Sequence, residues 1–256
     1  MRISKCTLLL LIIGCFVFSL FTEQASADIA VGPLTKTIQV APGRSKTVVY
    51  KVANHGKEPI VLTISARTWF ALPENKDIEI SDWLNLKTKK VRLSPGRTKR
   101  LRFRVKVPKN AVGELAGMIY FTPERKAAQM LGTSYGVSLY VFVKGTEKIE
   151  PAIGDVLISK REEKSYLAVT IENKGNVHFR PKVNATAKVG EKFKEDLELP
   201  FGKPIFGGQK YTFVGKFEGK LPEIGTCLVD VLCNYGKGKG AILKKSVSLN
   251  LGEIKE

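Results

Sequence analysis

Apolar and polar side chains alternate with a period of two residues through most of this 256-residue chain. Arg100–Val107 reads RLRFRVKV and Ile60–Ala66 reads IVLTISA, whereas helical spacing of apolar residues is almost absent. Successive side chains of a β-strand point to opposite faces, so this period indicates strands that are buried on one face only. Turn sequences such as Ala41-Pro42-Gly43 and Ser94-Pro95-Gly96 separate the runs at intervals of about ten residues. The pattern predicts an all-β protein built as antiparallel sandwiches.

The same order of strand and turn occurs twice along the chain. VANHGKEPIVLTI starts at Val52 and IENKGNVHFRPKV starts at Ile171, and each reads as a strand, an Asn-x-Gly turn and a second strand. The alternation breaks between Glu147 and Gly154 and then resumes. We therefore expect two immunoglobulin-like β-sandwich domains in tandem, at residues 28–148 and 149–256, each of a size that suits this architecture.

Residues 1–27 have the layout of a secretory signal peptide. Arg2 and Lys5 precede the uncharged apolar run Cys6–Phe21, and Ala25-Ser26-Ala27 supplies a small-residue cleavage pattern. Cleavage after Ala27 would leave an extracytoplasmic protein without a transmembrane span. Two alternatives stay open, namely retention of the apolar run as an N-terminal anchor and lipidation at Cys15.

Basic side chains are in excess and gather in the first half of the chain. The chain has 42 Lys and Arg against 24 Asp and Glu, a formal net charge of +18. One predicted strand carries a row of four cations, spaced by about 6.8 Å on one face, whose other face is apolar and must pack inward. This cationic face consists of Arg100, Arg102, Arg104 and Lys106.

Such a face can meet an acidic polymer of the cell envelope, an anionic lipid surface or an acidic partner. The alternative is a solvated face that guards an edge strand against aggregation. Nucleic acid is not expected as a partner, because the protein is exported and no aromatic residues interleave the row for stacking.

No catalytic or metal-binding set can be assembled from the sequence. The two histidines, His55 and His178, lie near no nucleophile motif of the G-x-S-x-G type. We expect no enzyme activity, no metal and no cofactor. Cys227 and Cys233 are six residues apart, which is about 20 Å in one extended strand. A disulfide needs a far shorter separation, so we expect two buried thiols unless a turn lies between them.

The strands and turns of the first half, taken in order, resemble the N-terminal domain of the periplasmic pilus-assembly chaperones, and the second half resembles their C-terminal domain more loosely. The residues that carry the resemblance are Ile29-Ala30-Val31-Gly32-Pro33, Val52-Ala53-Asn54 with Pro59, Ala66-Arg67-Thr68-Trp69, Val91–Gly96, Gly117–Phe121 with Pro123, Ile171-Glu172-Asn173 and His178. These are fold motifs, and the match covers nearly all of the chain after residue 27.

The resemblance implies a function as well as a fold. Chaperones of that family lend a strand to an unfinished, pilin-like subunit, and alternate apolar side chains fill the groove of the subunit. In this chain the strand would be Gln129–Lys144, and the partner-strand row would be Leu131, Thr133, Tyr135, Val137 and Leu139. Gly132 and Gly136 interrupt this strand, so the alternative is that it only completes its own sheet.

The resemblance also implies a basic pair that binds the C-terminal carboxylate of the subunit. Lys36 and Lys144 are the candidates here, although Thr35 matches the first position equally well and Tyr140 stands at the position of the second. The sequence thus favours an exported, chaperone-like binding protein. The second hypothesis is a structural or adhesive envelope module that docks on an acidic polymer through the cationic face.

Overall fold

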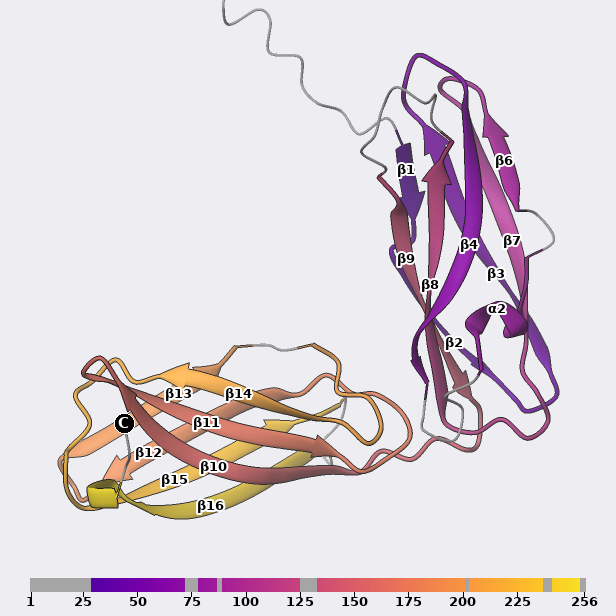
Figure 1. Ribbon diagram of the computed structural model, residues 1–256. Coiled ribbons are helices and arrows are strands. Elements are labelled where there is room, and N and C mark those ends of the chain that lie inside the picture. The colour runs from indigo at the N-terminus through magenta and orange to yellow at the C-terminus, as the bar shows by residue number, and fades with distance from the viewer. Residues whose placement is uncertain are drawn as a thin grey trace, which may run out of the picture.

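The computed structural model describes residues 29–71, 78–86, 89–124, 133–200, 203–236 and 241–253, which form two β-sandwiches set at an angle to each other (Figure 1). The predicted signal peptide lies outside the described residues, and so do Leu131 and Gly132. Across the described ranges, no helix combines the length and the apolar composition needed to cross a membrane. The predicted fold class, two immunoglobulin-like sandwiches in tandem, is confirmed. The limits 28–148 and 149–256 stay a prediction.

The first sandwich packs a four-stranded sheet against a five-stranded sheet. The order β1-β3-β7-β5 comprises β1 (Ile29–Gly32), β3 (Ser45–Asn54), β7 (Thr98–Lys106) and β5 (Leu84–Asn85). The order β2-β9-β8-β4-β6 comprises β2 (Thr35–Val40), β9 (Tyr135–Val143), β8 (Glu114–Pro123), β4 (Ile60–Ala71) and β6 (Lys90–Leu93). A single helical turn, α2 (Ile80–Trp83), packs against β4.

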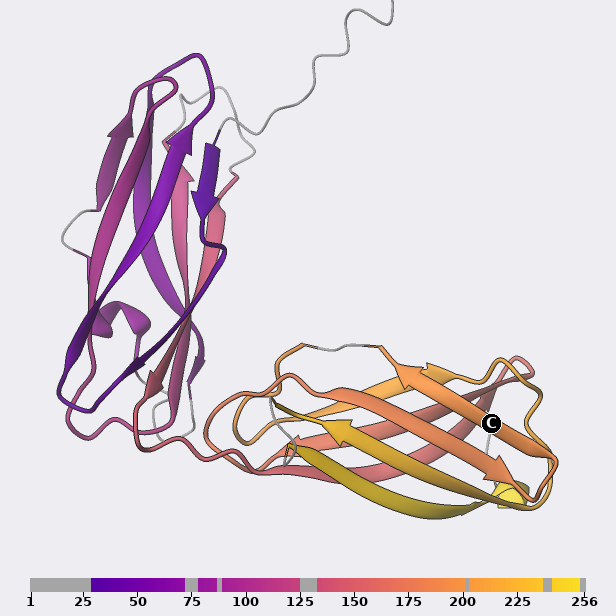
Figure 2. The ribbon, with the colours of Figure 1, turned by 180° about the vertical axis from the view of Figure 1, so that it is seen from behind.

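The second sandwich has the same plan with fewer strands. Its three-stranded sheet, β10-β11-β14, comprises β10 (Pro151–Arg161), β11 (Lys164–Asn173) and β14 (Lys210–Lys216). Its four-stranded sheet, β13-β12-β15-β16, comprises β13 (Phe193–Leu199), β12 (Lys182–Val189), β15 (Thr226–Asn234) and β16 (Ile242–Asn250), followed by the short 3-10 helix η3 (Leu251–Glu253). Figure 2 shows both sandwiches from behind, with their strands running along the long axis of each.

The two-residue alternation of the sequence becomes the two faces of each strand. In β7, Leu101, Phe103 and Val105 are buried in the core of the first sandwich, while the cations between them are exposed. In β15, Cys227 and Cys233 lie on the inward face, and both thiols are buried and free, as expected. Burial of such faces removes apolar surface from water, which is the main favourable contribution to folding.

A buried asparagine organises the turn after β3. Asn54 has no exposed surface, and its side-chain amide donates to the carbonyls of Glu58 and Leu93 at 2.8 and 3.3 Å. Its Oδ1 accepts the N–H of Gly56 at 3.0 Å. One side chain thus satisfies three backbone groups that belong to two separate turns.

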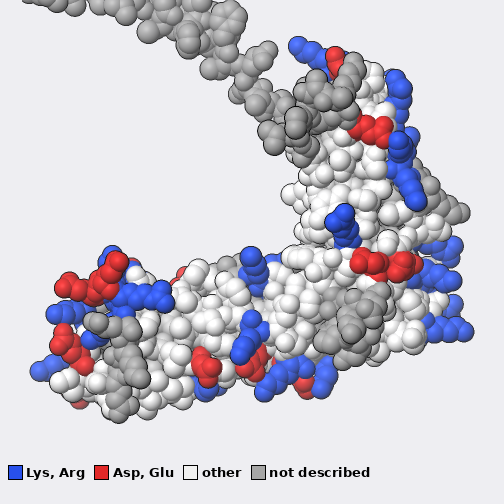
Figure 3. Space-filling view, viewed as in Figure 1, with Lys and Arg blue, Asp and Glu red and all other residues white. Residues whose placement is uncertain are grey.

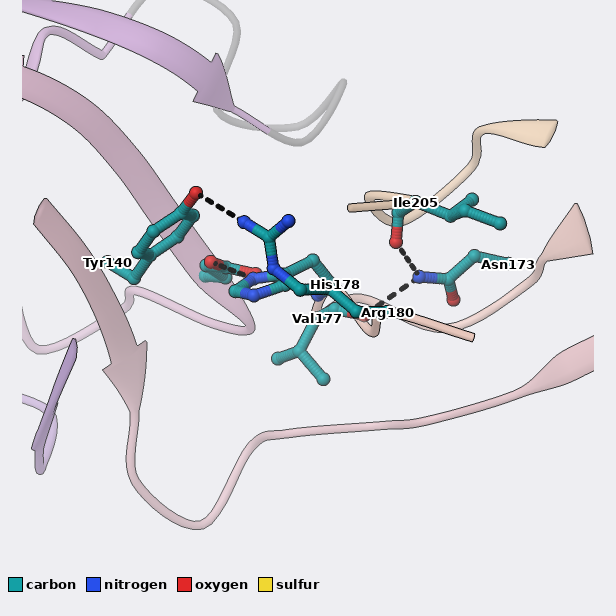
Figure 4. Close-up of polar contacts among 7 residues, drawn as sticks. Tyr140, Asn173, Val177, His178, Arg180 and Ile205 are labelled. Carbon is teal, nitrogen blue, oxygen red and sulfur yellow. Dashed lines mark hydrogen bonds and ion pairs between the residues drawn. The ribbon is translucent and has the colours of Figure 1, made fainter. Parts of the chain in front are cut away.

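The second sandwich repeats this arrangement after β11 (Figure 4). The Asn173 amide donates to the carbonyls of Val177 and Ile205, each at 2.8 Å, and its Oδ1 accepts the N–H of Gly175 at 3.0 Å. The repeat seen in the sequence is therefore a repeat of the same hydrogen-bonded unit. We refer to these two units as the asparagine clamps.

The last strand of the first sandwich is shorter than the predicted Gln129–Lys144. The strand β9 begins at Tyr135, and the preceding Thr133 and Ser134 are not in a strand. It pairs antiparallel with β8 from Tyr135 to Phe142, and parallel with β2 from Ser138 to Val143. From Ser138 onward β9 is therefore an interior strand, paired on both edges.

Candidate functional site

The part of the partner-strand row that the structure describes faces the core of the first sandwich. Val137 and Leu139 have no exposed surface, and Tyr135 packs against the same core half-buried. Thr133 is exposed and precedes the strand, while Leu131 lies outside the described residues. The strand thus forms part of its own sheet, and donation of this row to a subunit stays a prediction.

One edge of β9 is open at its N-terminal end. The strand β2 meets β9 only from Ser138, whose N–H donates to the Leu34 carbonyl at 2.8 Å. Alternate residues of a strand direct their peptide groups to the same edge, so the N–H and C=O of Gly136 point to this side as well. In the described chain, no strand pairs with that edge between Tyr135 and Val137.

Gly136 lies close to two side chains on the outer face of the sheet. A Cβ atom at this position would stand 2.8 Å from Cε of Met118 and 3.3 Å from Cε1 of Tyr120. Both side chains come from the neighbouring strand β8 and lie across the glycine.

The structure does not bring Lys36 and Lys144 together. Lys36 is paired with Leu139, and Lys144 follows the end of β9, where its N–H donates to the Val40 carbonyl. Positions 139 and 144 are about 16 Å apart along extended chain. An anion-binding pair of these two lysines therefore has no support in the geometry.

The two sandwiches meet at the other end of β8 and β9, through Glu114 and His178. Glu114 is fully buried, and its two carboxylate oxygens lie 2.7 Å from the His178 backbone nitrogen and 2.6 Å from its Nδ1. A buried carboxylate is costly unless it is hydrogen-bonded, and His178 provides both partners from the second sandwich. This contact fixes the second sandwich against the first.

Aromatic side chains surround this contact and exclude water from it. Phe206 of the second sandwich stacks on Phe70 at a ring separation of 4.2 Å and lies 5.5 Å from Trp69. Tyr140, on the outer face of β9, lies 4.6 Å from the His178 ring. We refer to Glu114, His178, Phe70, Phe206 and Tyr140 as the interdomain joint.

Two exposed groups border the joint. Arg180 is exposed and its Nη2 donates to the Tyr140 hydroxyl at 3.3 Å (Figure 4). Trp69, the extra residue of a bulge in β4, is 46% exposed and lies 5.8 Å from the Tyr140 ring. Burial raises the pKa of Tyr140, so its hydroxyl stays neutral and can accept from the guanidinium. An aromatic wall beside a cation can hold a carboxylate next to an apolar group.

The linker between the sandwiches is bound to the turn of the second asparagine clamp. Lys148 N–H donates to Asn176 Oδ1 at 2.6 Å, and the Asn176 amide donates to the Thr146 carbonyl at 2.9 Å. A Cβ atom at Gly175 would collide with the Lys148 carbonyl, so only glycine fits against the linker. The linker is therefore held in place along this turn.

The cationic face is a row on the surface, as predicted. Arg100, Arg102, Arg104 and Lys106 are all exposed on β7, in the sheet opposite to that of β9. Figure 3 shows basic side chains gathered along the β6–β7 side of the first sandwich, and acidic side chains on both sandwiches. No group of three or more potential metal ligands occurs in the ranges that the structure describes.

Sequence reasoning missed the residues of the interdomain joint. Glu114 and His178 are 64 positions apart, and Tyr140 and Arg180 are 40 apart. The one available signal was Glu114 itself, a carboxylate at the start of a run of apolar residues, Leu115–Phe121, that has no acidic or basic member.

Comparison with solved structures identifies the fold, whereas comparison of sequences identifies no family. No protein-family model matches the sequence, and no curated protein matches it. Among solved structures, the class 5 fimbriae chaperone CfaA aligns with a TM-score of 0.50 and 18% identity, over 85% of this chain and 98% of that one. A chain from a chaperone–tip adhesin complex of CFA/I fimbriae biogenesis aligns with a TM-score of 0.50 and 17% identity, over 86% of this chain and 98% of that one. The resemblance to the pilus-assembly chaperones is thereby confirmed for the fold.

Proposed function

We propose that this protein is a diverged member of the pilus-assembly chaperone family, exported to the periplasm or another extracytoplasmic space, which binds pilin-like subunits by strand pairing. It acts as a binding protein and not as an enzyme. The observation that carries the proposal is the open edge of β9 at Gly136, in a chain with the two-sandwich fold of a fimbrial chaperone. Main-chain hydrogen bonds along such an edge give affinity without needing a particular side-chain chemistry.

The edge proposed for the subunit is shorter than the sequence suggested. It runs from Thr133 to Val137, because β2 occupies the edge from Ser138 onward. Of the partner-strand row, Thr133 is exposed and Tyr135 is half-buried, whereas Val137 and Leu139 belong to the core. Of these four side chains, only Thr133 and Tyr135, at the N-terminal end of the strand, would therefore contact a subunit.

For the carboxylate of the subunit, we propose Arg180 in place of the pair Lys36 and Lys144. Arg180 is exposed beside Tyr140 and Trp69, at the angle between the sandwiches, and no ion pair of the described residues includes it. A guanidinium binds a carboxylate through two parallel hydrogen bonds, which a lysine cannot do.

Co-expression with a panel of small exported, pilin-like β-rich proteins tests the proposal. The purified complex should contain one of them, should survive moderate salt, and should be lost in Thr133→Asp and Tyr135→Asp variants, because a charge cannot enter an apolar groove. Tyr211→Asp is the matched control, since Tyr211 is a 40% exposed tyrosine on β14, an edge strand of the other sandwich.

The proposal is overturned if both Thr133→Asp and Tyr135→Asp retain the subunit while folding normally. Thr133 is exposed and outside the strand, so its substitution leaves the fold intact and keeps the test decisive. Arg180→Ser should weaken binding of a subunit with a free C-terminus and leave binding of a C-terminally amidated one unchanged.

A further inference from the structure

The cationic face belongs to a sheet that has no acidic residue in any of its strands. The four strands β1, β3, β5 and β7 contain no Asp or Glu. On the outer side of β3, Lys51 is exposed and stands opposite Arg100, which adds a fifth cation to the row. The other outward residues of β3 are small or apolar, namely Ser45, Thr47 and Val49.

No carboxylate compensates these charges. None of the ion pairs in the described residues includes Lys51 or a member of the cationic face. The side chain of Arg104 donates from Nε to the Ser45 hydroxyl at 2.9 Å, which holds its guanidinium over the sheet and leaves both terminal nitrogens available. Adjacent cations repel each other, so the row lowers stability unless an anion binds it.

The second sandwich provides an internal comparison. Its strand β14 corresponds to β7, since each follows a glycine turn and pairs with the strand that ends in an asparagine clamp. The outward residues of β14 are Lys210, Thr212, Val214 and Lys216. Lys210 stands opposite Glu172, and Lys216 forms an ion pair with Glu218 at 3.5 Å. The equivalent edge strand therefore carries two outward cations, each beside an acid, and protection of an edge does not account for five cations without one.

We propose that the cationic face, with Lys51, binds a linear polyanion that carries phosphate groups. The four cations of β7 lie in one line at intervals of about 6.8 Å, which suits a chain of anionic groups lying along the strand. Three of them are arginines, whose planar guanidinium binds phosphate through two hydrogen bonds. No large exposed apolar side chain lies on β3 or β7 to enter a lipid layer, so a polymer fits this surface better than a membrane does.

This surface is separate from the proposed subunit edge. The cationic face belongs to the sheet β1-β3-β7-β5, and β9 belongs to the opposite sheet of the same sandwich. A polymer bound on one sheet leaves the other sheet free for a subunit, so the two proposals stand or fall separately.

Titration of the purified protein with poly(glycerol phosphate) over a range of salt concentrations tests the inference. The wild-type protein should bind, and the variant with Arg100→Ser, Arg102→Ser and Arg104→Ser should bind at least about tenfold more weakly at low salt. The slope of log affinity against log salt concentration should fall by about three, one for each phosphate contact removed. A second variant, Lys51→Ser with Lys106→Ser, should lower this slope by about two. If the triple variant does not fold, the double variant tests the inference in its place.

The matched control is Lys210→Ser with Lys216→Ser, which removes two cations from the equivalent strand and should leave affinity and slope unchanged. Equal losses in this control would overturn the inference, because binding would then follow net charge and not the row. Tighter binding to phosphatidylglycerol vesicles would assign the face to a membrane, and tighter binding to poly-γ-glutamate would assign it to carboxylates. Either result, or no binding by the wild-type protein, contradicts the inference.

Discussion

Asn54 and Asn173 are buried, and each forms hydrogen bonds with three backbone groups. An unsatisfied buried polar group costs about 1–3 kcal/mol, so one asparagine contributes more to its sandwich than a typical single hydrogen bond. The amide is needed for both roles at once, because it donates two bonds and accepts a third. Aspartate has the same shape but cannot donate.

We expect Asn54→Ala and Asn173→Ala each to lower the free energy of unfolding by about 2–4 kcal/mol, because carbonyls and an N–H lose their partners inside the protein. Denaturant unfolding monitored by circular dichroism measures this loss. Asn85→Ala is the control, since Asn85 is exposed on β5 and its substitution should cost less than about 0.5 kcal/mol. Equal midpoints for Asn54→Ala and Asn85→Ala would show that the clamp does not stabilise the fold.

The buried thiol of Cys233 gives a prediction that depends on pH. Burial raises the pKa of Cys233 to about 11 from an ordinary value near 9, because the thiolate is poorly solvated there. The unfolded chain releases this proton at lower pH than the folded chain, so the contribution to stability is present below pH 9 and is lost as the pH rises toward 11.

The urea midpoint of the wild-type protein should therefore fall more steeply between pH 9 and pH 11 than that of Cys233→Val, a variant without the titrating group. Thiol reagents should leave Cys233 unmodified at pH 8 in the folded protein, because the reactive species is the thiolate. Parallel midpoint curves for the two proteins would contradict the assignment.

Residue-level prediction succeeded where local alternation decides the outcome. The period of two placed the cationic face outside and Cys227 and Cys233 inside, since neighbours along one strand determine both. It failed for Glu114 and His178 because a contact between distant segments depends on how the two sandwiches meet, which no local pattern contains. The separation of the two candidates Lys36 and Lys144 depends on the register along β2 and β9, which the sequence does not contain.

At the scale of elements, β9 shows how neighbouring strands limit what a strand can offer. The resemblance to the pilus-assembly chaperones predicted this strand, but its extent depends on its neighbours, because β8 pairs with it from Tyr135 and β2 only from Ser138. Alternation is equally consistent with a donated strand and with a core strand, so the sequence left both open. Val137 and Leu139 are buried because the inner face of β9 packs in the core of the first sandwich.

The contact between β8 and α2 depends on a glycine. A Cβ atom at Gly117 would stand 2.6 Å from Cγ2 of the fully buried Ile80, whose branched side chain has no room to move. We expect Gly117→Ala to lower the stability of the protein by about 1–3 kcal/mol by displacing α2. Thermal unfolding measures the loss. Gly252→Ala, where the nearest atom is at 3.6 Å, should leave the melting temperature unchanged.

At the scale of the whole molecule, the interdomain joint and the bound linker set the angle between the sandwiches. The joint is small, but Glu114 is fully buried in it and contacts His178 through both oxygens. Loss of one partner of this buried hydrogen-bonded contact is destabilising, because the other partner is left unsatisfied inside the protein. The range of angles between the two sandwiches should therefore be narrow in the wild-type protein.

Glu114→Ala should widen the range of orientations, and small-angle X-ray scattering should record a broader distribution of interatomic distances with an unchanged core. Glu124→Ala is the matched control, since Glu124 follows the other end of β8 and forms an exposed ion pair with Lys90. An unaltered scattering profile for Glu114→Ala would show that the linker alone holds the angle.

The turn Asn173–Asn176 is hydrogen-bonded to residues 146–148. The two halves of the chain would therefore lose different contacts if they were produced separately. A fragment that stops before Thr146 keeps its own asparagine clamp complete, because Asn54 bonds only within the first half. In a fragment that starts at Ile149, the side-chain nitrogen and oxygen of Asn176 lose their linker partners and face water. This fragment also lacks Lys148, whose backbone lies against Gly175. The turn of the C-terminal half therefore depends on residues 146–148 of the linker, whereas the N-terminal half depends on His178 of the other half for both hydrogen bonds of the buried Glu114.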